Sequence, residues 1–409
     1  MKCPDTFRDA KVVVVSPVAG GSFSVSRHVV DAFDELGADV TDLDMSWLVP
    51  PDTWYSANRN PSVRAQLVDY ASELVLAETE RVKPDLCFVM AQAPLSTKAV
   101  EALRAAGVRT AYWFVENYRL TRYWSTIAPS YDWFFTAQRG RFQELLTQTG
   151  CANTHWLPLA CNPKRHRPRR LTERQRRFYG SDVSFAGFGY YNRRELFRGL
   201  SDMDFKIWGS GWESSAVARL VQRDGRAFDH EDFVRIASAA QIHVNLHSAA
   251  HVPGVDPDGD YLNPRVFELA ACEAFQLCDP RSDLSSMFHV PREIPVYDDI
   301  ASLRNHILHY SKNPEERRCI ARAARARALA DHTYVHRMLE VARLTLTRER
   351  SLEVPAYSGH LEGFPAISVR RFRDPEDFTA LVDELALEDR ASDDEVLLRL
   401  ASVSRRTSP

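Results

Sequence analysis

A carboxylate follows a predicted helix start in the segment Asn263-Pro264-Arg265-Val266-Phe267-Glu268. Asparagine followed by proline is typical of a helix N-cap and first position, where backbone N–H groups have no partner inside the helix. These N–H groups attract anions such as phosphate, and Glu268 gains from the same helix dipole. A carboxylate one turn into the helix can also accept hydrogen bonds from both hydroxyls of a ribose. We therefore expect Asn263, Arg265 and Glu268 to contact a ligand; the alternative is a capping glutamate without a ligand.

A second candidate site is the segment GFGYYNRR, which lies between a predicted strand and a predicted helix. Gly187 and Gly189 lack a Cβ, so a ligand can approach the backbone closely there. Arg193 and Arg194 stand near a helix N-terminus, where their charges oppose the helix dipole. This cost is understandable if a diphosphate binds between them. The alternative is that both arginines are simply solvated.

Two more glycine turns follow predicted strands. Gly20 and Gly21 lie in PVAGGS, after the apolar run KVVVV, and are a second place where backbone could approach a ligand. An ordinary strand-to-helix turn is the alternative. The run AGGSFS lacks the GxGxxG pattern, which argues against a nicotinamide oxidoreductase. Gly209 lies in WGSGW, which suits either a base-stacking wall or a packed turn.

Short apolar strands alternate with helices along most of the chain. This pattern predicts parallel sheets covered by helices on both faces, in two doubly wound, Rossmann-like α/β domains that face a cleft. The expected N-terminal domain spans 1–162, and the C-terminal domain spans 182–345. The polar, arginine-rich segment 163–181 is interpreted as a linker, and 346–409 as a C-terminal helical extension with two short helices, DPEDFTALVDELAL and SDDEVLLRLASV.

Local signals mark several element boundaries. Asn60-Pro61 and Asn313-Pro314 are typical helix starts, and Ser96 is a candidate N-cap. The segment after Pro314, from EERRC to RLTL, is strongly helical. FQLCD and EIPVYD are predicted strands, and Trp113, Phe114, Trp133, Phe134 and Phe135 are expected to be core residues.

Composition limits the class of protein. The 409 residues are 44% hydrophobic, enough for more than one core, and carry a net charge of −3. This charge gives no electrostatic reason to expect nucleic-acid binding. No apolar run is long enough for a membrane span, and MKCPDTFRDAK lacks the apolar core of a signal peptide. The 7 scattered cysteines form no CxxC pair, so we expect a reduced, cytoplasmic protein. The oligomeric state is not readable from the sequence.

Eight stretches resemble, in order and spacing, a GT-B glycosyltransferase of the CgeB-like (spore maturation protein) family, over roughly residues 10–345. They are PDLCFVMAQ, TAYWFVEN, YDWFFTAQ, SDVSFAGFGYYNRRELF, KIWGSGW, IHVNLH, NPRVFELAACEAFQLCD and DHTYVHRML. The resemblance implies a hexosyltransferase-type enzyme whose C-terminal domain binds a nucleoside-diphosphate sugar, with a UDP-sugar as the commonest donor and no other cofactor. It also implies that Glu268 binds the ribose, that Arg193 or Arg194 binds the diphosphate, and that Gly20 and Gly21 approach the transferred sugar.

Two positions depart from the pattern that this resemblance implies. Glu273 stands where the family usually has glycine. Asp260 stands eight residues before Glu268, where many GT-B enzymes have glutamate. These departures keep open the alternative of a non-catalytic GT-B-like scaffold that binds a sugar nucleotide or a partner protein.

Transfer of a sugar requires stabilisation of the leaving group and, in an inverting reaction, a general base. We expect no metal site, because Asp256-Pro257-Asp258 lies in a DPDGD segment typical of a turn. Arginines and helix dipoles would then stabilise the leaving group. An inverting reaction needs a general base, for which Glu116 is the first candidate and His28 the second. The acceptor, whether a carbohydrate, a protein or a small molecule, would contact the polar loop from Pro50 to Pro61, with Trp54 and Tyr55.

Overall fold

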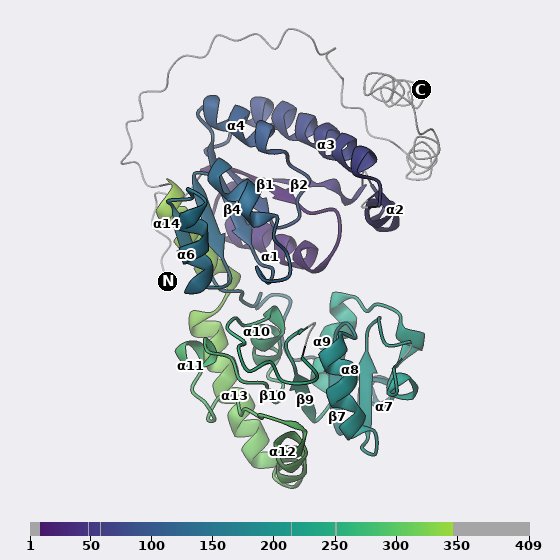
Figure 1. Cartoon of the computed structure of the whole chain (residues 1–409). Coiled ribbons are helices and arrows are strands. Elements are labelled where there is room, and N and C mark those ends of the chain that lie inside the picture. The colour runs from purple at the N-terminus through teal and green to yellow at the C-terminus, as the bar shows by residue number, and fades with distance from the viewer. Residues whose placement is uncertain (1–8, 48, 58, 214, 250–251, 347–409) are drawn as a thin grey trace. The chain divides into compact units, whose positions relative to one another are not determined.

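The computed structural model describes residues 9–47, 49–57, 59–213, 215–249 and 252–346. The chain divides into two compact units (Figure 1). The first contains the described residues up to Leu157 together with those from Met338 onward, and the second is Pro158–Arg337. Each unit has a parallel sheet with helices on both faces. The predicted α/β class with two Rossmann-like domains is therefore confirmed.

The first unit is built on a six-stranded parallel sheet in the order β2-β1-β3-β4-β5-β6. Its elements are β1 (Lys11–Ser16), α1 (Gly21–Glu35), β2 (Asp39–Asp44), η2 (Met45–Trp47), α2 (Pro51–Ala57), α3 (Pro61–Val82), β3 (Leu86–Met90), α4 (Thr97–Ala105), β4 (Arg109–Phe114), α5 (Trp124–Ile127), η3 (Ala128–Ser130), β5 (Trp133–Thr136), α6 (Arg141–Gln148) and β6 (Thr154–Trp156). Figure 1 shows α3 and α4 along one face of this sheet and α1 along the other.

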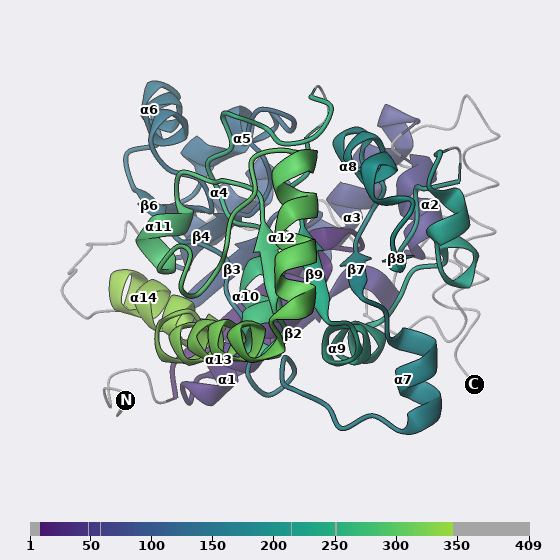
Figure 2. The same cartoon turned by 90° about the horizontal axis from the view of Figure 1, so that it is seen from below.

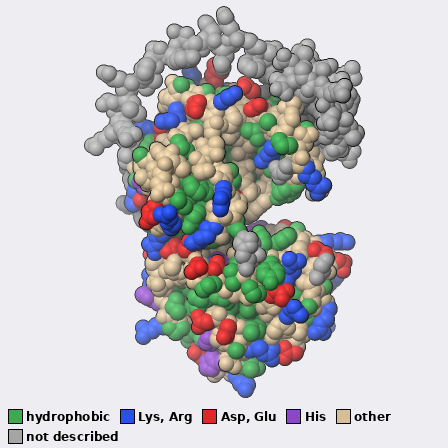
Figure 3. All heavy atoms as spheres, viewed as in Figure 1, with side chains coloured by type: hydrophobic (Ala, Val, Ile, Leu, Met, Phe, Trp, Pro, Cys, Tyr) green, Lys and Arg blue, Asp and Glu red, His purple; other side chains and the backbone are tan. Residues whose placement is uncertain are grey.

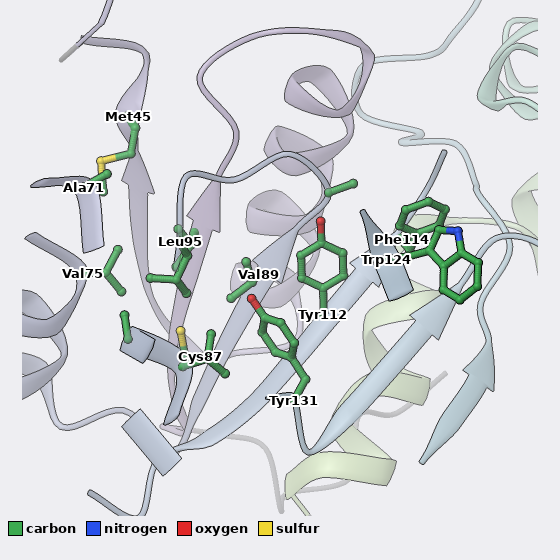
Figure 4. Packing of buried hydrophobic residues seen from close by; sticks show 14 of the residues in the cluster. Met45, Ala71, Val75, Cys87, Val89, Leu95, Tyr112, Phe114, Trp124 and Tyr131 are labelled. Atoms are coloured by element: carbon green, nitrogen blue, oxygen red, sulfur yellow. The ribbon is translucent and has the colours of Figure 1, made fainter. Parts of the chain in front are cut away.

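The local signals explain these boundaries. The Asn60 side chain accepts hydrogen bonds from the first N–H groups of α3, and Ser96 caps α4 by accepting one from Ala99 N. Both predicted caps are confirmed. The core forms where α3 meets the sheet, with Val75 of the helix near Cys87 and Val89 of β3 (Figure 4). The five aromatic residues predicted for the core are all buried.

The second unit is built on a four-stranded parallel sheet in the order β10-β9-β7-β8. Its elements are α7 (Glu173–Tyr179), β7 (Val183–Ala186), α8 (Tyr191–Phe197), η4 (Arg198–Leu200), β8 (Phe205–Trp208), η5 (Ala218–Leu220), η6 (Arg223–Gly225), α9 (His230–Ala239), β9 (Ile242–Asn245), α10 (Pro264–Ala271), β10 (Gln276–Cys278), α11 (Leu284–Met287), α12 (Ile300–Lys312) and α13 (Pro314–Asp331). Helix α14 (Tyr334–Leu346) begins in this unit and ends in the first.

The two faces of this sheet have separate cores, because successive side chains of a strand point to opposite faces. Phe185 of β7 packs in the cluster that includes α8 and α12, whereas Ala186 packs in the cluster that includes α7, α9 and α10. Figure 2 shows α12 running across β9. Both faces of the four-stranded sheet are thereby covered by helices.

Several expectations about this part of the chain need correction. The predicted linker 163–181 belongs to the second unit and contains α7, which starts with a capping box at Thr172. Only Val296 of the predicted strand EIPVYD pairs, in an isolated bridge to Cys278, and the rest of the segment is irregular. The late helical segment is two helices, since His332 and Thr333 leave the helix where Thr333 bridges to Cys161.

Other expectations meet different outcomes. Helix α13 starts at Pro314 as predicted, but the Asn313 side chain donates to His309 O of the preceding helix instead of capping α13. The predicted loop Pro50 to Pro61 contains α2, and Trp54 is buried there because it packs in the core.

The two short helices expected after Arg350 lie outside the described residues. Among the described helices, none has both the length and the apolar composition to cross a membrane. Figure 3 shows acidic and basic side chains interspersed on the visible face of each unit.

Glu273 has an unusual backbone conformation. Its φ is 55°, in the left-handed region that favours glycine, directly after the end of α10. Its carboxylate lies 3.5 Å from Arg322 and 3.9 Å from Arg325. A glycine at this place would therefore suit the backbone, so the usual glycine at this position is explained by helix termination.

We expect Glu273→Gly to be more stable than Glu273→Ala by about 1 kcal/mol, because alanine keeps the Cβ that disfavours positive φ. Both variants lose the carboxylate, so the difference between them isolates the backbone conformation. Urea unfolding measures it. Equal free energies of unfolding for the two variants would contradict the left-handed conformation of residue 273.

Candidate functional site

The loops predicted to bind ligand lie together at one edge of each sheet. In the second unit, β7, β8, β9 and β10 are parallel, so their carboxyl ends share an edge. In such sheets ligands bind beyond this edge, where loops and helix N-termini meet. The segments that follow the four strands begin at Gly187, Gly209, Leu246 and Asp279.

The two glycine loops of this edge pack directly on each other. Gly189 N donates to Ser210 O at 2.9 Å, and a Cβ on Gly189 would lie 2.7 Å from the carbonyl carbon of Gly211. Gly187 N likewise donates to Trp208 O at 2.9 Å. The absence of a side chain at Gly189 is thus required by packing between the loops, whereas a Cβ on Gly187 would meet the side chains of Phe185 and Arg193 at 3.0 and 3.4 Å. Approach by a ligand, which the sequence predicted, stays a prediction.

The WGSGW turn is a packed turn. Gly209 has a φ of +115°, and a Cβ there would lie 2.6 Å from Gly187 O. Trp208 and Trp212 are each 1% exposed, and Trp212 Nε1 donates to Gly187 O at 3.1 Å. Their rings are therefore core residues, and neither offers a stacking wall to a base in this conformation.

We expect Gly189→Ala to destabilise the protein by about 1–3 kcal/mol, since the new methyl group overpacks a fixed backbone contact. Gly21→Ala is the matched control, because a Cβ at Gly21 meets nothing within 4 Å. Chemical denaturation of both variants measures the effect. A Gly189→Ala protein as stable as Gly21→Ala would show that the loops are not packed as described.

Arg193 is a buried clamp on the loop after β7. Its Nε donates to Leu246 O at 2.8 Å and its Nη1 to Phe188 O at 2.9 Å. The guanidinium also lies 4.9 Å from the centre of the Phe185 ring. Burial lowers the pKa of Arg193 to about 10. Arg194 is only half-buried, so of the two it has the more accessible charge for an anion.

A hydrogen-bonded chain that the sequence did not predict supports the start of α10. His247 Nδ1 lies 2.6 Å from Asp279 Oδ1, and Arg281 donates from Nε to Asp279 Oδ2 at 3.0 Å. His247 Nε2 accepts a hydrogen bond from Asn263 N at 2.9 Å. Because Nε2 accepts, the ring proton is on Nδ1 and points at Asp279. The chain thus links β10 to the N-terminus of α10.

Burial and hydrogen-bond partners determine the protonation states of the residues in and beside this hydrogen-bonded chain. Burial opposes ionisation of Asp279, but the neighbouring His247 and Arg281 outweigh it and lower the pKa of the carboxyl. Burial lowers the pKa of His247, so the ring is neutral, as its hydrogen bonds require. Cys278 Sγ lies within 4.8 Å of these groups, and burial raises the pKa of its thiol. A protonated thiol and the guanidinium of Arg281 make this group a poor cation site.

Asn263 caps α10 as the sequence predicted. Its side chain accepts from Val266 N at 3.2 Å and its Nδ2 donates to Asn245 Oδ1 at 3.0 Å. Since Asn263 N itself donates to His247, two amides near this helix start already have partners inside the unit. The remaining first-turn amides are the ones to consider for an anion.

Glu268 is a buried carboxylate, 6% exposed, on α10. Arg265 Nη1 donates to Glu268 Oε2 at 2.5 Å, and His166 Nε2 lies 3.7 Å from Oε1. Asn162 N donates to His166 Nδ1 at 3.0 Å, so the proton of this ring is on Nε2. The Arg265 guanidinium is itself placed over the Phe233 ring at 3.9 Å. Glu268 and Arg265, both predicted site residues, are therefore brought together.

A pocket of the second unit lies at the other end of its sheet. Its volume is about 280 Å³, and its lining includes Arg169, Glu273 and Arg317. Gln241 and Phe275, which also line it, precede β9 and β10, so the pocket is at the amino ends of the strands. Because ligands of parallel sheets bind at the carboxyl ends, we keep the candidate site at Glu268.

The first unit brings Gly20 and Glu116 to one place, through Gln92. Gly20 has a φ of 96°, and a Cβ there would lie 2.8 Å from Gln92 Oε1 and 3.6 Å from the Tyr55 hydroxyl. Gln92 Nε2 donates to Glu116 Oε1. The three residues follow β1, β3 and β4, whose carboxyl ends share an edge. Gly21, the first residue of α1, has open space beside it.

Glu116 sits in a network of hydroxyls. The Tyr123 hydroxyl donates to Glu116 Oε2 at 2.8 Å and lies 3.2 Å from the Tyr112 hydroxyl. Burial raises the pKa of Glu116, and the hydrogen bonds from Tyr123 and Thr121 only partly offset this. A carboxylate with a raised pKa and an oriented lone pair is suited to accept a proton. Figure 4 shows Tyr112 beside Tyr131 within the core of this unit.

His28 lies on the buried side of α1 and is 4% exposed. A role as a general base stays a prediction for this residue. Gln92 could have been found in the sequence, because it follows a clear strand, PDLCFVMA, at its carboxyl end. Tyr123 could not, since it lies in a stretch without periodic apolar residues.

This chain is similar to known proteins in sequence and in fold. Residues 193–343 match the sequence model of a family described as glycosyl transferase-like. No curated protein matches the chain significantly. Similar solved structures include sucrose-phosphate synthase from Thermosynechococcus elongatus, with 13% identity, a TM-score of 0.57, and coverage of 82% of this chain and 98% of that chain. A glycosyltransferase from Rickettsia africae ESF-5 has 12% identity and a TM-score of 0.56 over 83% and 99% of the two chains.

A third similar structure is Anabaena Alr3699/HepE, solved with UDP-glucose. It has 10% identity, a TM-score of 0.54, and coverage of 82% of this chain and 99% of that chain. These likenesses extend over both units and show that the fold is of the GT-B type. At such low sequence identity, the similarity establishes the fold and nothing about function.

Proposed function

We propose that this chain is a glycosyltransferase that moves a hexosyl group from a nucleoside-diphosphate sugar to an acceptor. The observation that carries the proposal is the buried Glu268 carboxylate, held by Arg265 near the start of α10. This helix lies within residues 193–343, the part of the chain that matches the glycosyl transferase-like family. A UDP-sugar is the proposed donor; HepE, of similar fold, was solved with UDP-glucose.

In the proposed donor complex, Glu268 accepts hydrogen bonds from the two ribose hydroxyls. Arg194, Arg265 and first-turn amides of α10 face the diphosphate. An acceptor hydroxyl gives its proton to Glu116 while its oxygen bonds to the anomeric carbon of the sugar. The bond from this carbon to the diphosphate oxygen breaks, and the nucleoside diphosphate leaves with the electron pair. Arginines and helix dipoles stabilise its charge, so the proposal includes no metal.

The finer parts of the proposal rest on the sequence. The CgeB-like subfamily follows from the eight ordered stretches, and the cytoplasmic location fits the free thiols of the six described cysteines. The acceptor-side residues Gly20, Gln92 and Glu116 belong to the first unit, where a carbohydrate, protein or small-molecule acceptor would be chosen.

A thermal-shift screen of the full chain with UDP, GDP, ADP and their sugars tests the proposal. A ligand present at one hundred times its Kd should stabilise its unit by about 2.7 kcal/mol. Release of free nucleoside diphosphate from the bound sugar nucleotide should follow. Binding without any release, with or without candidate acceptors, would favour the scaffold alternative. An absence of binding by every nucleotide would overturn the proposal.

A further inference from the structure

Arg64 is a cation without an anion. It lies in the first turns of α3, half-buried, with its guanidinium carbon 3.1 Å from the centre of the Trp54 ring. Its Nη1 is fully buried and has no hydrogen-bond partner. Of the residues that the structure describes, none accepts a hydrogen bond from this guanidinium or forms an ion pair with it.

This lack of a partner sets Arg64 apart from the buried arginines Arg193, Arg281 and Arg337. Arg193 donates to two backbone carbonyls, and Arg337 donates to Pro158 O and Leu159 O. Arg281 is paired with Asp279. Burying a charged group without hydrogen bonds is costly, and proteins generally avoid it. An arginine whose charge has no partner within the described part of the protein is therefore a candidate site for an anion.

Burial lowers the pKa of Arg64 to about 10, so the guanidinium stays charged at neutral pH. The Trp54 ring covers one face of the guanidinium, an arrangement in which ring and cation attract each other. The N–H groups of an arginine point outward along the edges of its guanidinium plane. Nη1 is buried, but Nε and Nη2 are not among the buried atoms, so the edge formed by these two nitrogens can take an oxyanion with two parallel hydrogen bonds.

The position of Arg64 relates it to the acceptor side of the first unit. Helices α2 and α3 follow β2, so the start of α3 comes after the carboxyl end of a strand of the six-stranded sheet. Tyr55, the residue after Trp54 on α2, has its hydroxyl 3.6 Å from a Cβ built on Gly20. A Cβ on Gly20 would also lie 2.8 Å from Oε1 of Gln92, the hydrogen-bond partner of Glu116.

We propose that Arg64 and Trp54 form a binding site for an oxyanion, a phosphoryl or carboxylate group carried by the acceptor. The acceptor class is thus a phosphorylated or carboxylated molecule rather than a neutral glycan. The assignment to the acceptor rests on the proposed function, whereas anion binding at Arg64 does not. The other source of such a group is the diphosphate of the donor, and the experiment must separate the two.

Isothermal titration of the full chain with inorganic phosphate, in the presence of saturating UDP, tests the site. UDP occupies the proposed diphosphate site of the second unit, so phosphate reports on the remaining sites. We expect Arg64→Gln to weaken phosphate binding at least tenfold. Arg59→Gln is the matched control, an exposed arginine five residues earlier, and should leave the affinity within about twofold. Equal affinities of the wild type and Arg64→Gln would overturn the proposal.

A parallel titration with UDP separates this proposal from the proposed function. UDP should bind the wild type and Arg64→Gln equally if the donor lies on the second unit. UDP binding lost with Arg64→Gln would assign Arg64 to the donor and overturn the acceptor assignment. A wild type that binds phosphate through Arg64 but does not bind UDP would overturn the proposed function alone.

Arg64→Lys guards against a variant that fails to fold. Lysine keeps the charge but loses the planar pair of donors, so phosphate should bind this variant more weakly than the wild type. Modification by phenylglyoxal, followed by peptide mass spectrometry, provides a second measurement on the wild type alone. Phosphate should protect Arg64 and leave Arg59 reactive. Protection of neither arginine would contradict the site.

Discussion

Replacing Glu268 by glutamine should weaken UDP binding by about 10- to 100-fold, the value of one or two hydrogen bonds to a charged group. The substitution keeps the shape of a side chain that is 6% exposed, so packing is preserved. What is lost is the negative charge that accepts the ribose hydroxyls and pairs with Arg265. Glutamine can donate as well as accept, so one hydroxyl meets an amide group instead of an oxygen. Isothermal titration with UDP measures the change.

Glu273→Gln is the matched control for this experiment. It removes a carboxylate five residues further on, which lies just past the end of α10 and interacts only weakly with Arg322 and Arg325. UDP affinity of this variant should equal that of the wild type. A Glu268→Gln protein that binds UDP as tightly as Glu273→Gln would remove the observation on which the proposed function rests.

Replacing Glu116 by glutamine should lower kcat by about 10²- to 10⁴-fold, the usual contribution of a general base. UDP affinity should not change, because Glu116 belongs to the first unit and the donor residues to the second. Glu101→Gln, an exposed glutamate of α4, is the matched control and should keep full activity. Steady-state kinetics on the acceptor found in a screen provide the measurement. Loss of UDP binding in Glu116→Gln would instead mean that this residue supports the fold.

The pH profile adds an independent readout for Glu116. A general base must be deprotonated, so activity should fall as pH drops through the pKa of Glu116. Burial raises this pKa above the ordinary glutamate value, so the fall should begin at a higher pH than for an exposed carboxyl. Tyr123→Phe removes a hydrogen bond that lowers the pKa, and should move the fall to still higher pH. The residual activity of Glu116→Gln should not show this decrease at low pH.

Much of the fold follows from local signals. The run of valines in β1 is continuous because the strand is buried on both faces, and a short-range pattern reveals this. The caps at Asn60 and Ser96 involve only residues within three positions, so sequence spacing is sufficient to predict them. The predicted strand EIPVYD was wrong for the opposite reason, since pairing depends on a partner strand that no local pattern describes.

Some residues of the candidate site could likewise be predicted from local signals, and others could not. Its carboxylates were predictable, because Glu116 and Glu268 follow recognisable strands and helix starts. The partners of the site residues were not, because they come from distant segments: Arg193 bonds to Leu246, and His247 to Asp279. Trp54, which the sequence placed in a polar loop, is buried on α2 against Arg64, and this pairing could not be predicted from the sequence.

The sequence by itself determined the α/β class, the alternation of strands and helices, and which residue types stand at the carboxyl ends of the strands. These properties depend on apolar periodicity and capping, which act over a few residues. Only the tertiary structure decided which charges are paired and which donors lack a partner. Arg193 and Arg64 have the same side chain, yet one is satisfied by carbonyls and the other is not. Pairing of this kind depends on chain packing between residues far apart in sequence.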